Sequence, residues 1–116
     1  MKIKLLKSKI HRAKVTDANL KYEGSISIDS ELMAKVNIKN YEKVHVLNLT
    51  NGSRLETYAI PGESGSKSVC INGAAAHLVN PGDRVIIVSY CSLNLEESDD
   101  YKPSIIKLNE QNDIIG

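Results

Sequence analysis

The residues in this sequence that are best suited to carry out a reaction are a glycine and the serine that follows it, Gly24-Ser25. The serine hydroxyl is placed to attack the carbonyl of the preceding glycine. Glycine favours that attack because it has no side chain to hinder the approach and tolerates a strained backbone. The pair is therefore a candidate for cleavage of the chain's own backbone. The alternative, an ordinary turn before a strand, stays open at this point.

A second candidate group lies in residues 54–60, which predict a β-strand. Alternation along a strand places Arg54 and Tyr58 on one face and Thr57 on the other. The arginine suits a bidentate grip on a carboxylate, and the phenol suits proton transfer. If all three residues serve one site, the strand must twist or bulge there, or the site must lie between subunits. The alternative is a solvated arginine beside ordinary strand residues.

The elements that must position these residues are mostly β, with short strands between strong turn signals. The strands are expected at 44–49, 54–60, 69–71, 84–91 and 104–108. Asn51-Gly52 predicts a tight hairpin in which both residues take positive φ. Two short helices are expected, one that Asp29 or Ser30 caps and one that starts at Ala74. We expect residues 92–102 to form a polar surface excursion and residues 109–116 to fray.

An internal repeat links two of these segments. Residues 38–46 align with residues 79–87 at a constant offset of 41, and both run from an apolar residue through a turn into a strand. Two copies of one unit would pair around a shared core, and a closed barrel with pseudo-two-fold symmetry leaves no open edge. Tyr41 stands where the second unit has Gly82, at a turn position that favours a small residue. Chance similarity remains an alternative for so short a match.

Composition excludes several classes of function. The chain has 116 residues, with 15 basic and 14 acidic side chains and neither Trp nor Phe. That balance argues against binding to nucleic acid or to a membrane surface. Cys70 and Cys91 are interpreted as reduced core thiols, and no spacing suggests a metal site. The N-terminus has no signal-peptide pattern, so the cytoplasm is expected. These features alone also fit a non-catalytic small β-barrel binding module.

Four motifs, taken together and in order, carry a family resemblance. They are Ser8–Ala13, Thr16–Leu20, Tyr22–Ile26 and Ile71–Ala76. The set resembles the bacterial aspartate 1-decarboxylases over nearly the whole chain. The resemblance implies a mostly β fold, a small closed double-psi β-barrel with short helices. It also implies one domain, residues 1–116, that cleaves itself at Gly24-Ser25 into chains 1–24 and 25–116.

The same resemblance implies a chemistry for these residues. The family makes β-alanine and CO2 from L-aspartate for pantothenate biosynthesis, with a pyruvoyl cofactor that in this chain would form from Ser25. The ketone forms an imine with the substrate amine, which is the electron sink for decarboxylation. By this resemblance Thr57 donates to the Gly24 carbonyl oxygen during cleavage and contacts substrate, Lys9 and Arg54 bind the carboxylates, and Tyr58 returns a proton to Cα.

The remaining expectations concern the surroundings and the partners of that site. In the family the segment Asn72-Gly73-Ala74-Ala75 contacts substrate and cofactor, and its helix start offers backbone N–H groups to an anion. His11 and Tyr22 fall at supporting positions, and the family forms a homotetramer with sites at subunit junctions. Two questions stay open in the sequence: whether the substrate is aspartate or glutamate, and whether cleavage is spontaneous or needs a maturation factor.

Overall fold

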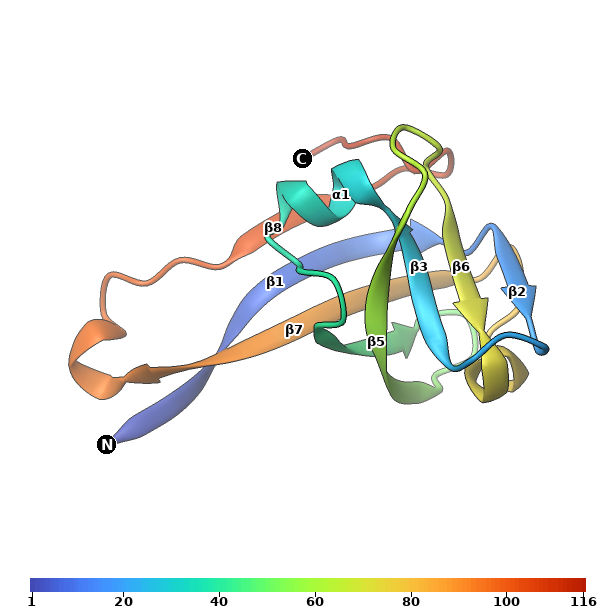
Figure 1. Cartoon of the computed structure of the whole chain (residues 1–116). Helices are drawn as coiled ribbons and strands as arrows, with labels where there is room; N and C mark the ends of the chain where they lie inside the picture. Colours follow the sequence, from blue (N-terminus) through green and yellow to red (C-terminus); the bar gives the residue numbers. More distant parts are fainter.

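Strands dominate the computed structural model, which describes all 116 residues (Figure 1). The strands are β1 (Lys2–Lys14), β2 (Asp17–Asn19), β3 (Ser25–Asp29), β4 (Lys43–Asn48), β5 (Arg54–Gly62), β6 (Val69–Asn72), β7 (Arg84–Asn94) and β8 (Ser104–Lys107). Helix is limited to α1 (Ser30–Lys35) and to the 3-10 turns η1 (Gly73–His77) and η2 (Leu95–Glu97). None of these helices is long and apolar enough to cross a membrane. The prediction of a mostly β chain is confirmed.

The strands form one hydrogen-bonded sheet that curls back on itself. Its order is β2-β6-β3-β5-β4-β7-β1-β8. Strand β2 at one edge continues directly from β1 near the other edge, through Val15 and Thr16. The Thr16 N–H donates to the Val69 carbonyl of β6 at 2.8 Å, and the Val15 N–H donates to the Asp83 carbonyl at 2.9 Å. One continuous run of chain therefore joins the two sides of the sheet, which gives the barrel on the right of Figure 1.

The barrel interior is filled by aliphatic side chains that alternate along each strand. In β3, Ile26 and Ile28 are fully buried, while Ser25 and Ser27 point away from them. In β4, Val44 and Val46 are fully buried in the same way. A cluster of 20 buried apolar residues results. Burial of that apolar surface is the main force that holds the barrel together.

The internal repeat is structural rather than a chance match. Tyr41 and Gly82, at equivalent positions, both take the left-handed conformation, with φ of 70° and 91°. The Tyr41 N–H donates to the Ala59 carbonyl at 2.7 Å, and the Gly82 N–H donates to the Val15 carbonyl at 2.8 Å. A tyrosine therefore adopts a backbone conformation that is easier for glycine.

The acidic residue after each of these positions has the same local role. The Glu42 carboxylate accepts from the Lys39 N–H at 2.9 Å, and the Asp83 carboxylate accepts from the Asn80 N–H at 2.9 Å. Each acid thus closes its own turn before a strand begins. The aligned segments therefore build two equivalent turns and lead into β4 and β7, which pair with each other.

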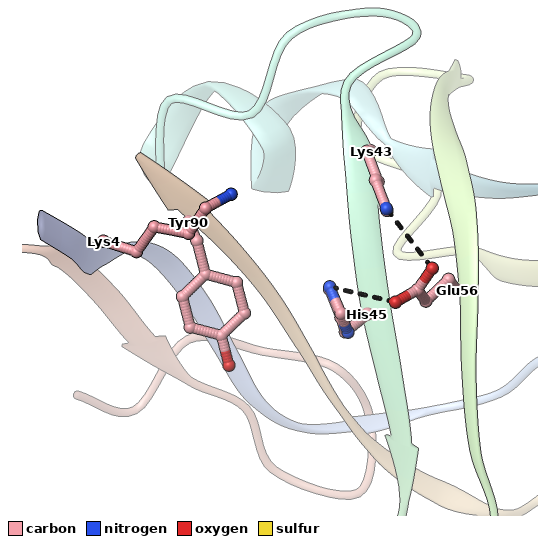
Figure 2. A pocket seen from close by; sticks show the side chains of 5 residues that line it. All are labelled: Lys4, Lys43, His45, Glu56 and Tyr90. Atoms are coloured by element: carbon pink, nitrogen blue, oxygen red, sulfur yellow. Dashed lines mark ion pairs between the residues drawn. The ribbon is translucent and has the colours of Figure 1, made fainter. Parts of the chain in front are cut away.

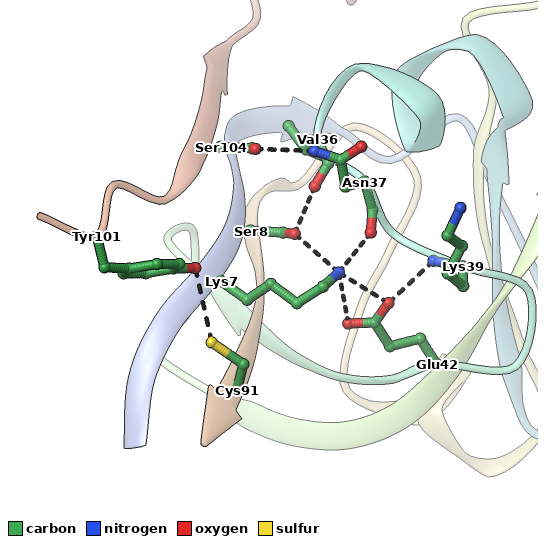
Figure 3. Close-up of polar contacts among 9 residues, drawn as sticks. All are labelled: Lys7, Ser8, Val36, Asn37, Lys39, Glu42, Cys91, Tyr101 and Ser104. Carbon is green, nitrogen blue, oxygen red and sulfur yellow. Dashed lines mark hydrogen bonds and ion pairs between the residues drawn. The ribbon is translucent and has the colours of Figure 1, made fainter. Parts of the chain in front are cut away.

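A two-stranded ribbon of β1 and β7 extends beyond the barrel, with the N-terminus at its far end (Figure 1). Strand β7 runs to Asn94, further than predicted, because its end pairs with the first residues of β1. At the base of the ribbon, the Lys7 ammonium contacts the Glu42 carboxylate at 3.1 Å and the Asn37 carbonyl (Figure 3). The Cys91 thiol lies 3.6 Å from the Tyr101 hydroxyl.

Three sequence expectations about turns and ends have different outcomes. The Asp29 carboxylate caps α1 by accepting from the Glu31 N–H at 2.9 Å, as predicted. The β4–β5 hairpin is not the tight two-residue turn expected from Asn51-Gly52, because only Gly52 takes positive φ and five residues connect the strands. The tail 109–116 does not fray. Its Asn112 is buried and bonds the backbone of Lys14 at 2.8 Å and 2.9 Å.

Candidate active site around Ser25

Ser25 lies at the first position of β3 and opens onto a cavity of about 480 Å³. The cavity is walled by strands β3, β5 and β6 and by the loop that precedes Ser25; its lining residues are Tyr22, Glu23, Ser25, Ser27, Tyr41, Tyr58, Ile60, Cys70 and Asn72. Only 4% of the Ser25 surface is exposed. The hydroxyl is thus shielded from bulk water at the floor of a space large enough for a small molecule.

The Ser25 hydroxyl is held by a side-chain amide from the neighbouring strand. Ser25 and Asn72 are direct partners in the antiparallel pair of β3 and β6. The Asn72 Nδ2 donates to Ser25 Oγ at 3.0 Å and to Ser27 Oγ at 3.2 Å. The nearest acceptor for the Ser25 proton is the Glu23 carbonyl oxygen, at 3.5 Å. The serine therefore has a fixed donor and a candidate acceptor for its own proton.

Glycine is required at position 73 rather than at position 24. Gly73 has φ of +74°, and a Cβ there would lie 2.7 Å from both Cα and N of Gly24. At Gly24 a Cβ would meet nothing within 4 Å, and its φ is not positive. The expected backbone strain at Gly24 is therefore absent. What the structure provides instead is a close approach of the Gly73 backbone to Cα and N of Gly24.

Tyr58 reaches the Ser25 cavity from β5, as a proton donor would need to. Its ring packs at 6.1 Å from the ring of Tyr41, measured between centroids. Tyr41 lies outside every sequence motif that suggested chemistry, yet it lines the same cavity. Its left-handed backbone and its ring contact place it in the wall of the cavity.

Thr57 faces away from this cavity. It pairs with Val44, whose side chain is fully buried, and it lies between Leu55 and Ala59 on the inner face of β5. The predicted alternation, with Thr57 opposite Arg54 and Tyr58, is confirmed. Thr57 does not line the cavity, and its role as a donor to the Gly24 carbonyl stays a prediction.

The two predicted cations, Lys9 and Arg54, lie on the outer wall of the barrel, away from the Ser25 cavity. Arg54 starts β5 and borders a hollow of about 400 Å³ with His45 and Glu56. Lys9 is half-buried on β1, between the fully buried Ser8 and Ile10, so its side chain points outward. Neither cation lines the cavity that contains Ser25.

A second hollow, of about 510 Å³, shares His45 and Glu56 with the hollow that Arg54 borders (Figure 2). Four strands contribute its lining residues, which are Lys4, Lys43, His45, Glu56 and Tyr90. The Glu56 carboxylate lies 3.3 Å from the Lys43 ammonium and 3.7 Å from the His45 ring nitrogen. No group of three or more His, Cys, Asp and Glu side chains gathers where it could hold a metal ion.

The supporting residues His11 and Tyr22 occupy different regions. Tyr22 borders the Ser25 cavity. His11 is on β1, opposite Lys107 of β8, and its Nδ1 is buried with no partner. Burial, and then the positive charges of Lys9, Lys107 and Arg12, hold the pKa of His11 below its ordinary value. His11 is therefore neutral at physiological pH.

The segment Asn72–Ala75 differs from the helix start that was expected. It opens the 3-10 helix η1, which is too short to act as an anion seat, and the Asn72 side chain makes no capping bond. That side chain turns toward Ser25 instead. Ala74 is exposed and Ala75 packs against the core. Small side chains here serve the close approach of Gly73 to Gly24.

Sequence reasoning missed several residues of the cavity, namely Glu23, Ser27, Tyr41, Ile60 and Cys70. Two signals were available. Ser27 follows Ser25 by two residues, so it shares the outer face of the same strand. Tyr41 breaks the pattern of the internal repeat, in which Gly82 is its counterpart. Cys70 had no such signal, because its place depends on the pairing of β6 with β3.

Comparisons with known proteins match nearly the whole chain to one family. The family model described as aspartate decarboxylase matches residues 1–115. The chain is 56% identical to aspartate 1-decarboxylase of Clostridium kluyveri over 114 residues, covering 98% of this chain and 90% of the relative. It is 55% identical to the enzyme of that name from Caldicellulosiruptor bescii, with 99% and 90% covered.

The fold also has a solved counterpart. The rationally designed mkDPBB_sym_86 protein matches with a TM-score of 0.50 and 16% identity, over 66% of this chain and 90% of the design. This design is a double-psi β-barrel, so the match confirms the fold that was expected for this chain. The match of nearly every residue to one family model, together with relatives above half identity, shows that this chain belongs to the aspartate decarboxylase family.

Proposed function

We propose that this chain decarboxylates L-aspartate to β-alanine and CO2, the step that supplies β-alanine for pantothenate, with a pyruvoyl group made from its own Ser25. Membership of the family supports an enzyme rather than a non-catalytic binding module. The single observation that carries the proposal is the placement of Ser25. Its hydroxyl is buried in a cavity, next to the Gly24 carbonyl, and held by the Asn72 amide at 3.0 Å.

The pyruvoyl group would arise by cleavage of the bond between Gly24 and Ser25. Ser25 Oγ attacks the Gly24 carbonyl carbon, the C–N bond breaks, and the hydroxyl proton ends on the Ser25 nitrogen, which leaves an ester in place of the amide. Loss of the Ser25 Cα proton then expels the Gly24 carboxylate and leaves dehydroalanine. One water then hydrolyses the dehydroalanine, which releases its nitrogen as ammonia and leaves the pyruvoyl group. The chain thereby becomes residues 1–24 and residues 25–116.

Charge on the Gly24 carbonyl oxygen rises during the attack, and a donor there lowers the barrier. We assign that donor to Thr57, by family resemblance. Because Thr57 is on the inner face of β5, it would have to reach the Gly24 carbonyl from the barrel side, opposite the cavity. The attack by Ser25 would then come from the cavity and the stabilising hydrogen bond from the other side.

The residues around Ser25 fit a pyruvoyl group. Ser25 is buried at the edge of the cavity, and Asn72 brings an amide donor to position 25. When present, the group supplies a ketone that condenses with the substrate amine and takes up the electrons released as CO2 leaves. Tyr58 lines the same cavity, so we assign it the return of a proton to Cα. Gly73, Ala74 and Ala75 would leave room for the substrate backbone.

The substrate's two carboxylates require the cations Lys9 and Arg54, and the geometry places both away from Ser25. Lys9 does not line the Ser25 cavity, and strands β5, β4 and β7 lie between β3 and β1 in the sheet. Along β5, Arg54 is four residues from Tyr58, about 13 Å. We propose that a neighbouring copy supplies these cations within a homotetramer, so that each site lies between subunits.

Mixing two inactive variants tests the shared site. Ser25→Ala keeps Lys9 and Arg54 but cannot form the pyruvoyl group, whereas Arg54→Ala cleaves but lacks a cation. Co-refolding them should restore a measurable fraction of β-alanine production, and mixing without unfolding should restore none. A fully active monomer in light scattering, or co-assembled chains with no activity, would contradict the assembly proposal.

Intact mass under denaturing conditions tests the proposed function itself. The expected result is two chains, residues 1–24 and 25–116, the second with a mass that reports loss of the Ser25 amine. The same preparation should release CO2 from L-aspartate, and L-glutamate serves as the comparison substrate. A single chain of 116 residues with no decarboxylase activity would overturn the proposal.

A further inference from the structure

Cys70 is a polar residue of the Ser25 cavity to which neither the family resemblance nor the cleavage chemistry gives a role. It lies on β6, two residues before Asn72, and is the direct pairing partner of Ser27. Its side chain is half-buried and lines the cavity. Cys70 Sγ lies 3.3 Å from Asn72 Oδ1, within the range of an S–H···O hydrogen bond.

The contacts of the Asn72 side chain show why the position of the Cys70 thiol matters. A carboxamide has donors on nitrogen and an acceptor on oxygen, at opposite sides of one plane. Here the nitrogen donates to Ser25 Oγ at 3.0 Å and to Ser27 Oγ at 3.2 Å, and the oxygen accepts from Cys70. Both the nitrogen and the oxygen of the Asn72 amide thus have hydrogen-bond partners. Because sulfur is a weak acceptor, the reversed amide would lose its partner at the thiol.

The orientation of this amide controls the state of the serine hydroxyl. When Asn72 Nδ2 donates to Ser25 Oγ, the serine accepts and its own proton is free, with the Glu23 carbonyl as the nearest acceptor at 3.5 Å. If the amide were reversed, the serine would donate its proton to Oδ1 and hold it there. Attack on the Gly24 carbonyl requires the hydroxyl to release that proton.

We propose that Cys70 is a positioning residue for the self-cleavage at Gly24-Ser25, because its S–H fixes the Asn72 carboxamide with the nitrogen toward Ser25. The inference rests on the proposed function and deepens it by assigning the residue that sets the amide orientation. The Cys70 thiol makes no hydrogen bond to Ser25, and its only other acceptor is the Ile71 carbonyl of its own strand at 3.9 Å, so its link to the cleavage site runs through Asn72.

The surroundings keep this thiol in the form that can donate. Burial, and then the Asp17 carboxylate on β2, raise the pKa of the Cys70 thiol above its ordinary value. A thiol has a hydrogen to donate, whereas a thiolate can only accept. Cys70 is therefore protonated at physiological pH, and its local environment makes it a poor nucleophile.

Three substitutions at position 70 separate the hydrogen bond from the volume of the side chain. Cys70→Ser keeps a donor, Cys70→Ala removes it with a loss of volume, and Cys70→Val removes it with a gain. Each chain is made in a short cell-free pulse, and the appearance of residues 25–116 is followed on a denaturing gel. Cys91→Ala is the matched control, since that thiol bonds Tyr101 outside the cavity.

We expect cleavage to slow about tenfold in Cys70→Ala and Cys70→Val, the effect of one lost hydrogen bond on a barrier. Cys70→Ser and Cys91→Ala should cleave within about twofold of the wild type on the same scale. Two results would overturn the proposal: wild-type rates in both donor-free variants, or a Cys70→Ser rate as low as that of Cys70→Ala.

Failure of the inference and failure of the proposed function give different patterns. If the wild type cleaves and the position 70 variants all match it, only the role of Cys70 is wrong. If the wild type stays intact, the proposed function fails and the inference fails with it. Thermal unfolding of each variant, in a Ser25→Ala background that keeps the chain whole, shows whether a slow rate comes from a damaged fold.

Discussion

The chain contains three Gly-Ser pairs, and two of them, Gly24-Ser25 and Gly65-Ser66, differ in burial, backbone conformation and hydrogen bonding. Gly24-Ser25 leads into β3, while Gly65-Ser66 lies in the loop between β5 and β6. Ser25 is buried and accepts a hydrogen bond from a side chain of another strand. Ser66 is exposed and donates to the Glu63 carbonyl of its own turn at 2.6 Å. The dipeptide alone therefore does not predict cleavage, and the proposal of cleavage at Gly24-Ser25 rests on the surroundings of Ser25.

The two glycines show the same contrast from the side of the backbone. Gly65 needs glycine for its own conformation, with φ of +80°, and has open space around it. Gly24 has no such need. A Cβ added at Gly73, however, would lie 2.7 Å from Cα and N of Gly24. The proposed cleavage site is thus distinguished by the nearby Gly73 backbone, rather than by a positive φ at Gly24 itself.

The largest expected effect comes from removing the buried hydroxyl. Ser25→Ala should abolish cleavage, because no other group can attack the Gly24 carbonyl, and the chain should stay whole and folded. Ser66→Ala should cleave like the wild type, because its hydroxyl only closes a surface turn. Intact mass of both proteins checks this. Residues 1–24 released from Ser25→Ala would show that the mechanism is wrong.

The next effect tests the donor assigned to the inner face of the barrel. Thr57→Val keeps the shape and removes the hydroxyl, so cleavage should slow by about 10² to 10³, as for loss of one oxyanion donor. Thr16→Val is a matched control, since that threonine sits beside the other edge of β6 and bonds Val69. Equal rates in Thr57→Val and the wild type would leave Thr57 as an ordinary strand residue.

A smaller effect on the rate of cleavage is expected from substitution of Gly73, with Gly65 as its control. Gly73→Ala should slow cleavage by about tenfold to a hundredfold, because the added Cβ pushes Gly24 out of position. Gly73→Ala should lose more stability than Gly65→Ala, because its Cβ also meets the backbone of Gly24 and Tyr22; Gly65→Ala should lose about 1–2 kcal/mol, the cost of a left-handed conformation for alanine. Only the first should change the rate of cleavage. A matched loss of rate in both variants would point to stability rather than to contact with Gly24.

Sequence alone predicted the parts of this molecule that depend on local pattern. Alternation identified β4 and β5 and the opposite faces of Thr57 and Tyr58, and the capping role of Asp29 followed from residue type. The repeat anticipated two equivalent turns. These features come from interactions between residues close in sequence, which a pattern can encode.

The parts that were missed depend on which strands become neighbours. The contact of Asn72 with Ser25, which only the family resemblance implied, joins residues 47 apart and exists because β3 pairs antiparallel with β6. Cys70 enters the cavity through that same pairing. The tail was expected to fray, but Asn112 binds the backbone of Lys14, 98 residues away. No local pattern carries such pairings, so their residues could be found only in the folded chain.

The smallest expected effect on cleavage is that of Tyr58→Phe. Tyr58 lines the Ser25 cavity from β5, yet its hydroxyl makes no hydrogen bond to Ser25 or Asn72, so cleavage should proceed within about twofold of the wild type. Turnover of L-aspartate should fall by about 10² to 10⁴, the range for loss of a general acid.

The two readouts separate maturation from catalysis at one cavity. Reduction with borohydride in the presence of aspartate should still attach substrate to residue 25 of Tyr58→Phe, because the phenol is needed only after CO2 has left. Tyr101→Phe makes the same chemical change beside Cys91, outside the cavity, and should keep both cleavage and turnover. Full turnover by Tyr58→Phe would remove Tyr58 from the reaction and leave water or another side chain as the proton donor. Slow cleavage would instead mean that Tyr58 helps to position Gly24 and Ser25 before cleavage. The wall of the cavity would then serve maturation as well as turnover.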